Sequence, residues 1–208
     1  EKALELGVDV IEIDIFKCKS GELVVFHDKT LNRLTDAEGL IESLDIDSIR
    51  KIKIFNRYKI PTLIELLDLI DGKVFLNIEL KGENTALETN KIIVEHISKF
   101  NLPASKFIIS SFRWNELIKF RNVNQDVPIA ILVDSLYKID DAIKLARTIN
   151  ALALNPNNKF LTKQIVKKIQ SNNIQVHPYT INDPLNIKRI RSMGVDAIIT
   201  DYPERINK

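Results

Sequence analysis

Apolar and acidic residues alternate over residues 8–16, and this two-residue period predicts a β-strand with carboxylates on one face. A second short β run, residues 23–27, follows Ser20-Gly21, a dipeptide typical of tight turns. Two helices are predicted next, at residues 47–53 and 62–70. The second follows Pro61 and has Thr62 as its N-cap.

Beyond residue 70 the chain alternates between β-like and helical segments. Strands are predicted at residues 74–80, 107–111, 129–133, 151–154, 174–179 and 197–200. Helical patterns separate them, at residues 85–100, 114–121, 139–148, 160–171 and 184–193. Alternation of this kind indicates parallel βαβ units rather than a β-sandwich.

With residues 8–16, the pattern supplies seven core strands, and a closed (β/α)₈ or TIM barrel needs eight. The first residues, ending in Gly7 as a C-cap, have the pattern of the end of an amphipathic helix. We therefore expect an α/β fold, a TIM barrel whose first β/α unit precedes Glu1. An open doubly wound sheet is the alternative, but it needs a glycine-rich phosphate loop, and the chain has only 6 glycines and no G-x-G-x-x-G. No linker interrupts the chain, so residues 1–208 are expected to form a single barrel domain.

Composition narrows the class of protein. Among 208 residues, 30 basic and 28 acidic side chains give a formal net charge of +2, and the basic residues are spread along the chain, which argues against a nucleic-acid partner. The single cysteine, Cys18, fits a reducing compartment, and we expect a cytoplasmic protein. No apolar run approaches the ~20 residues that span a bilayer. Membrane contact is expected only through a segment upstream of Glu1.

Candidate chemistry collects where the predicted strands end, which is where barrel enzymes build their sites. Glu12 and Asp14 project from one face of the first strand, and Glu79 and Lys81 share a face at the end of a later one. Three carboxylates around one centre suit a hard divalent cation, Mg²⁺ or Ca²⁺, better than Zn²⁺. The alternative is structural, with Glu79 paired to Lys81 and the other two paired to a buried Arg or Lys. Lys81 is also placed to hold an anionic substrate group.

Histidine is the candidate acid or base. His27, followed by Asp28, closes the second β run, and beside a metal site its pKa near neutrality suits general acid–base catalysis. A lone histidine at a strand end is otherwise more often structural. His96 is predicted in mid-helix on a partly exposed face, and His177, near a strand end, is a weaker site candidate.

Five sequence segments, taken in order, resemble those of a known enzyme family. They are residues 3–14, which end in Glu-Ile-Asp, 21–28, which end in His-Asp, 60–63 (Ile-Pro-Thr-Leu), 77–81 (Asn-Ile-Glu-Leu-Lys) and 194–203. Together they resemble the glycerophosphodiester phosphodiesterases over essentially the whole chain. The Glu-x-Asp, His-Asp and Glu-x-Lys elements are specific in this order, although each alone is weak.

The resemblance implies a barrel enzyme that hydrolyses glycerophosphodiesters to an alcohol and sn-glycerol 3-phosphate with a divalent cation. By matching motif, Glu12, Asp14 and Glu79 would be the metal ligands, His27 one of two catalytic histidines, and Lys81 a phosphate contact.

The same resemblance implies substrate contacts near the end of the chain. Tyr179 stands where the family often has Trp, in a segment that continues to Asn182, and both are expected to line the substrate pocket. One departure is large: the family's His-Arg-Gly and Pro-Glu-Asn-Thr elements, which carry the other histidine and a phosphate-binding arginine, are absent from residues 1–208. They are expected upstream of Glu1; otherwise this chain is inactive.

Three rival functions stay open at this point. A phospholipase D-like enzyme of the sphingomyelinase D type uses similar carboxylate and histidine chemistry on lysolipids. A catalytically incomplete barrel could serve as a binding or regulatory domain, although such a domain has no reason to keep costly grouped charges. A sugar-phosphate isomerase barrel would need a phosphate-binding glycine loop after a late strand, which Gly194 alone does not supply.

Overall fold

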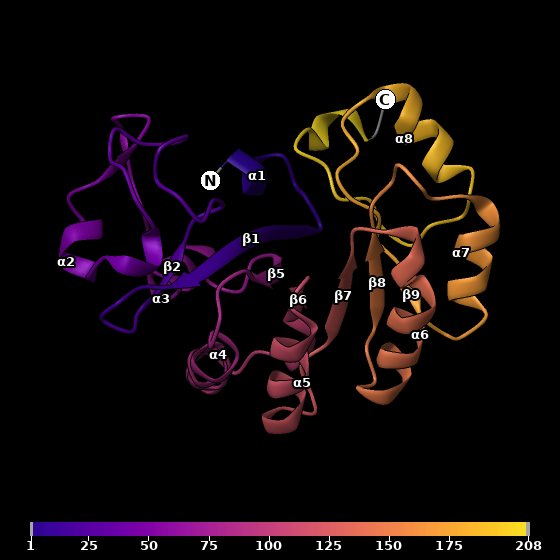
Figure 1. Ribbon diagram of the computed structural model, residues 1–208, viewed down its shortest axis with the longest axis horizontal. Helices are drawn as coiled ribbons and strands as arrows, with labels where there is room; N and C mark the ends of the chain where they lie inside the picture. Colours follow the sequence, from indigo (N-terminus) through magenta and orange to yellow (C-terminus); the bar gives the residue numbers. More distant parts are fainter. Residues whose placement is uncertain (1, 207–208) are drawn as a thin grey trace.

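The computed structural model describes residues 2–206, which form one main sheet flanked by helices (Figure 1). The sheet has seven strands, in the order β2 (Leu23–Val25), β1 (Val10–Lys17), β5 (Phe75–Leu80), β6 (Phe107–Ser111), β7 (Ile129–Val133), β8 (Ala153–Pro156) and β9 (Gln175–Val176). β2 is antiparallel to β1, and every other neighbouring pair is parallel. Strands that are consecutive in the barrel pattern are thus neighbours in space.

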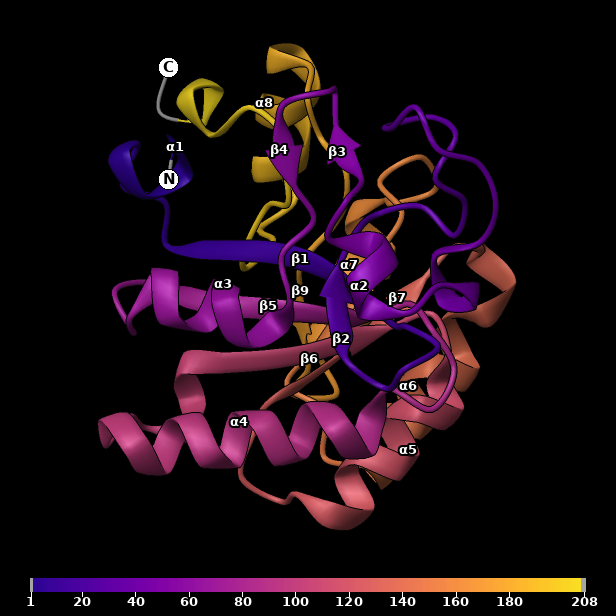
Figure 2. The same ribbon diagram turned by 90° about the vertical axis from the view of Figure 1, so that its left-hand side faces the viewer.

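Helices connect the parallel strands and cover the sheet. They are α3 (Leu63–Ile70), α4 (Ala86–Phe100), α5 (Trp114–Val123), α6 (Ile139–Thr148), α7 (Lys163–Gln170) and α8 (Pro184–Arg191), preceded by the short α1 (Lys2–Glu5). Figure 2 shows α3 and α4 lying alongside β5 and β6. The predicted N-cap is confirmed, because Thr62 and Glu65 form a reciprocal capping box at the start of α3. No helix within residues 2–206 is long and apolar enough to cross a membrane.

The strand order favours a barrel over a doubly wound sheet. From β1 through β9 the parallel strands follow one another without the reversal of order that a doubly wound sheet requires. The segment after α8 continues the series, since the Ile199 amide donates to the Pro178 carbonyl at 3.0 Å. Within the described residues the sheet remains open between this segment and β1.

The last predicted strand, residues 197–200, is wrong as a regular strand. No ladder is formed there, and the predicted strand 174–179 is reduced to Gln175–Val176. Two features interrupt the pairing. The Val176 amide donates to the Asp196 side chain instead of to a backbone carbonyl, and Pro178 has no N–H to donate.

The predicted helix at residues 47–53 is also largely wrong. Helix α2 covers only Ile46–Ile49, and the chain then forms a hairpin of β3 (Lys53–Ile54) and β4 (Tyr58–Lys59). The hairpin is tied to a distant loop, because Phe55 donates its amide hydrogen to the Leu34 carbonyl at 2.8 Å. A contact of this kind between separate segments leaves no trace in local periodicity.

The apolar side chains form two clusters. The larger lies between the sheet and the helices and includes Ile15, Ile78, Leu80, Phe120 and Val133. The smaller, which we call the insertion cluster, is formed by side chains between residues 16 and 60. It consists of Phe16, Cys18, Val24, Phe26, Leu31, Ile41, Ile49 and Ile60. The insertion cluster therefore supports the loops that follow β1 and β2, next to the ends of the barrel strands.

Candidate active site

The three predicted metal ligands lie together on two neighbouring strands, β1 and β5. Asp14 of β1 is in register with Glu79 of β5, and Glu12 is in register with Asn77, so these side chains share the inner face of the sheet. Glu12, Asp14 and Glu79 each place a carboxylate oxygen within 4.8 Å of the others. Because side chains alternate between the two faces of a strand, the Glu-x-Asp motif of β1 and the Glu-x-Lys motif of β5 bring their carboxylates together in one acidic centre.

The electrostatics of this centre favour protonated carboxyl groups when no cation is bound. Desolvation raises the pKa of Glu12 to about 8, although part of its side chain reaches solvent, and the charges of Asp14 and Glu79 add to the shift. Burial likewise raises the pKa of Glu79 to about 7. A divalent cation would remove both penalties, and three oxygen donors are the ligand type that Mg²⁺ and Ca²⁺ prefer. The residues present therefore fit such an ion.

Lys81 partly neutralises the acidic centre. Its ammonium group donates to the Asp14 carboxylate at 2.8 Å and lies 3.7 Å from Glu79. Burial lowers the pKa of Lys81, but the two carboxylates outweigh burial and raise it. The ion pair considered from the sequence is thus present, and it places a partly exposed lysine beside two of the three carboxylates.

A series of side-chain contacts, which the sequence analysis did not identify, holds His27 in place. Its Nδ1 contacts the Asp28 carboxylate, and Arg33 donates to both oxygens of that carboxylate, at 2.5 and 2.8 Å. Hydrogen bonds from Arg33 lead the effects that hold the pKa of Asp28 well below its usual range. This arrangement fixes the imidazole through Nδ1 and leaves Nε2 available. Arg33 lies in an irregular loop, so no periodic pattern could have indicated it.

The backbone connects His27 to the acidic centre. The Phe26 amide donates to the Asp14 carbonyl at 3.0 Å, directly beyond the antiparallel pairing of Ile15 with Val25. The Phe26 side chain is buried in the insertion cluster. The histidine and a predicted metal ligand are therefore held at neighbouring positions by a hydrogen bond on one side and apolar packing on the other.

The predicted substrate contacts lie after β9. Tyr179 packs edge-on against Phe112, with ring centroids 5.6 Å apart, and its hydroxyl donates to the Val133 carbonyl at 3.2 Å. The Asn182 carboxamide is already engaged, because it donates to Asp201 and accepts from the Asp201 amide. These two contacts hold the Tyr179 ring in place, whereas the Asn182 side chain is bonded to a neighbouring loop.

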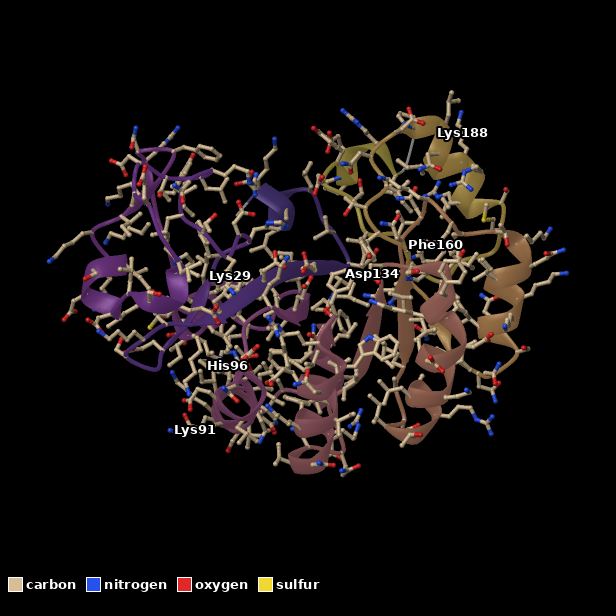
Figure 3. The ribbon with its side chains drawn as sticks, in the orientation of Figure 1. Lys29, Lys91, His96, Asp134, Phe160 and Lys188 are labelled. Carbon is tan, nitrogen blue, oxygen red and sulfur yellow. The ribbon has the colours of Figure 1, made fainter. Side chains whose placement is uncertain are left out.

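The other two histidines have different surroundings. The expectation of a partly exposed His96 is wrong: it is 7% exposed, and its ring packs at a tilt against Phe100 and edge-on against Phe107. Figure 3 shows His96 on α4, away from Asp134 at the end of β7. His177 is also buried, its Nε2 lies 2.9 Å from the Gln175 carboxamide, and burial lowers its pKa.

The inner face of the sheet also carries buried polar atoms without a hydrogen-bond partner among the described residues. They are Asn77 Oδ1, Ser110 Oγ and Asn155 Oδ1. Ser110 is in register with Glu79, and Asn77 lies two residues before it on the same face. Such groups need a donor from water or a ligand, so the interior beside the acidic centre is suited to polar molecules.

Comparison with known proteins identifies the family. The family model described as "Glycerophosphoryl diester phosphodiesterase family" matches residues 1–205. The chain belongs to this family. It is 32% identical to YqiK, an uncharacterised protein of Bacillus subtilis (strain 168), over 99% of this chain and 88% of that protein. It is 31% identical to a glycerophosphodiester phosphodiesterase of Caldanaerobacter subterraneus, over 99% of this chain and 87% of that one.

A solved structure supports the same assignment. An Oleispira antarctica phosphodiesterase in complex with the product sn-glycerol-3-phosphate has a TM-score of 0.88 to this chain at 26% identity, covering 99% of this chain and 86% of that one. The predicted TIM-barrel fold class and the family resemblance are therefore confirmed. The chain is a phosphoric diester hydrolase of the glycerophosphoryl diester phosphodiesterase family, and glycerophosphodiester hydrolysis is the activity that its relatives support.

Proposed function

We propose that this chain hydrolyses glycerophosphodiesters, releasing an alcohol and sn-glycerol 3-phosphate, in a reaction that depends on a divalent cation. The observation that carries the proposal is the acidic centre of Glu12, Asp14 and Glu79 with Lys81 and His27 at its edge, in a chain of this family. The product bound by the Oleispira relative supports the glycerol phosphate half of the substrate.

The proposed cation ligands are Glu12, Asp14 and Glu79, and the ion is Mg²⁺ or Ca²⁺. Bound there, the ion would supply positive charge to neutralise phosphate oxygens. Lys81 would add a second positive charge, because its partly exposed ammonium group lies beside two of the proposed ligands. The substrate phosphate would then be oriented by fixed charges.

His27 is the proposed acid–base residue. Asp28 holds Nδ1, so Nε2 is the atom that would donate a proton to the leaving alkoxide or accept one from the nucleophile. The aromatic ring of Tyr179 would form a wall of the substrate pocket, supported by Phe112. Asn182 remains a predicted substrate contact, and such contact would require its bonds to Asp201 to break.

The test compares wild type with His27→Ala in the complete protein, using glycerophosphocholine and measuring released sn-glycerol 3-phosphate. Loss of a general acid or base costs about 10²–10⁴-fold in rate, and we expect a loss in this range. Removal of metal with EDTA should abolish turnover, and Mg²⁺ or Ca²⁺ should restore it. Lys29→Ala, in the same loop, is the matched control and should retain activity. Near-full, metal-dependent turnover by His27→Ala would contradict the assignment.

The same assay separates the rival functions. A sphingomyelinase D-like enzyme would prefer lysophosphatidylcholine to glycerophosphocholine. A purely binding domain would take up the cation, measured by calorimetry, and lose that uptake in Glu12→Ala, yet the wild type would hydrolyse neither substrate.

A further inference from the structure

The β3–β4 hairpin presents two aromatic side chains to solvent. Phe55 is 67% exposed and Tyr58 is 54% exposed. Phe55 and its neighbour Asn56 both have left-handed backbone conformations, with φ of 49° and 56°. Asparagine adopts this region readily, whereas a bulky aromatic residue there is an outlier. A large apolar side chain at an exposed turn therefore has no explanation in the folding of the hairpin itself.

The hairpin is also strongly cationic. Residues 48–64 contain five basic side chains and no acidic one: Arg50, Lys51, Lys53, Arg57 and Lys59. Of these five, only Arg50 forms an ion pair within residues 2–206, with Glu65 at 3.9 Å. Arg57 instead lies over the Tyr58 ring, 5.0 Å from its centroid. The aromatic tip is thus bordered by basic side chains, four of which form no ion pair within residues 2–206.

The face that carries the active site has further exposed apolar groups. Of the described residues, the four most exposed large apolar side chains are Tyr137 at 93%, Leu185 at 75%, Phe55 at 67% and Leu87 at 58%. Leu87, Tyr137 and Leu185 lie in the segments that directly follow β5, β7 and β9. Because C-terminal ends of parallel strands meet at one end of a barrel, these segments begin at the end that holds Glu79.

The hairpin is linked to the catalytic loop. Phe55 donates its amide hydrogen to the carbonyl of Leu34, and Leu34 follows Arg33, which holds Asp28 beside His27. Figure 2 shows β3 and β4 standing away from β1. A backbone hydrogen bond therefore connects the exposed hairpin at Phe55 to the loop that positions His27.

We propose that this face, led by the β3–β4 hairpin, docks on the surface of an anionic phospholipid bilayer. Exposed aromatic and aliphatic side chains insert at the interface, and flanking lysine and arginine side chains attract anionic headgroups. Exposed aliphatic groups such as Leu87 and Leu185 favour a lipid partner over a nucleic acid, which would bind through its phosphates and bases. This contact differs from the upstream segment expected from the sequence, and it places the active site towards the lipid surface.

The test is co-sedimentation of the complete protein with phosphatidylglycerol or phosphatidylcholine vesicles, in EDTA so that no turnover occurs. We expect binding to phosphatidylglycerol that weakens as salt rises, and little binding to phosphatidylcholine. Each basic residue near an anionic surface contributes about fivefold in affinity, so Lys53→Gln/Arg57→Gln/Lys59→Gln should bind on the order of 100-fold more weakly. Phe55→Asn suits the left-handed backbone and should lose on the order of tenfold without loss of fold.

Two controls make the result specific. Leu69→Gln, on the helix end at the opposite side of the barrel and 50% exposed, should bind vesicles like the wild type. In Phe55→Trp/Trp114→Phe, whose one tryptophan lies at the hairpin, emission should shift to the blue with phosphatidylglycerol and be quenched by brominated acyl chains.

Three outcomes would overturn the proposal: vesicle binding that is absent, vesicle binding that is indifferent to lipid charge, or a Phe55→Asn variant whose only defect is loss of dimers or of RNA binding. Turnover of water-soluble glycerophosphocholine should be the same in Phe55→Asn and the wild type. Failure of vesicle binding is therefore distinguishable from failure of the proposed activity.

Discussion

If Glu12, Asp14 and Glu79 bind the proposed cation, its affinity should depend steeply on pH. Cation binding requires ionised carboxylates, so apparent affinity follows the fraction of molecules in which both Glu12 and Glu79 have lost their protons. With pKa values of about 8 and about 7, that fraction is roughly 0.45 at pH 8 and roughly 10⁻³ at pH 6. We therefore expect the dissociation constant for Mg²⁺ or Ca²⁺ to weaken on the order of 10²–10³-fold between pH 8 and pH 6. Two carboxyl groups at the ordinary value of 4.5 would leave the affinity almost unchanged over this interval.

Isothermal titration calorimetry at several pH values measures the effect. Repeating the titration at pH 7 in buffers of different ionisation enthalpy should reveal release of roughly one to two protons per cation. Glu12→Gln is the informative variant, because it removes the group with the higher pKa and keeps an oxygen donor. Its residual pH dependence should shrink to about tenfold, the contribution of Glu79 alone. A wild-type affinity that changes less than threefold, with no proton release, would refute this account of the site.

Three further predictions concern stability and positioning. In EDTA, Glu12 and Glu79 have higher pKa values in the folded protein than in the unfolded chain, where both are near 4.5, so this contribution to stability is lost as pH rises. Calorimetry should therefore show Tm falling from pH 5 to pH 8, and added cation should remove that trend. Arg33→Gln should release Asp28 and lower kcat on the order of 10–100-fold while cation affinity stays unchanged; equal losses of both would instead indicate a general disruption. Arg121 is 6% exposed and donates to the Ile149 and Asn124 carbonyls at 2.7 and 2.9 Å. Arg121→Met should therefore lower the free energy of unfolding, measured in urea, by about 1–3 kcal/mol. An unchanged free energy would show that water replaces the guanidinium at these carbonyls.

The barrel strands and the acidic centre were predictable because both depend on short-range periodicity. A two-residue period placed Glu12 and Asp14 on one face, and the βαβ rhythm brought the strand of Glu79 beside them. The boundaries of β6 and β7 agree with the predicted segments, because apolar runs in buried parallel strands end sharply at loops.

The errors lie where distant segments decide the local structure. The β3–β4 hairpin is held by a hydrogen bond to the Leu34 carbonyl, which is distant in sequence. Residues 197–200 form no regular strand because Pro178, on the neighbouring segment, has no N–H to donate to them. Arg33 is five residues from Asp28 in an irregular loop, so only the folded chain reveals that it orients the histidine support. Side-chain partners of this kind follow from tertiary geometry rather than from spacing.

The separation of the apolar side chains into two clusters has a consequence for how the site could fail. The three carboxylates lie on strands of the larger cluster, whereas His27 depends on Phe26 and the rest of the insertion cluster. Such clusters can open as separate cooperative units. Low denaturant should therefore open the insertion cluster first, giving a protein that should still take up the proposed cation but lose the proton transfer proposed for His27. Ion retention and turnover would then report the integrity of two different parts of one molecule.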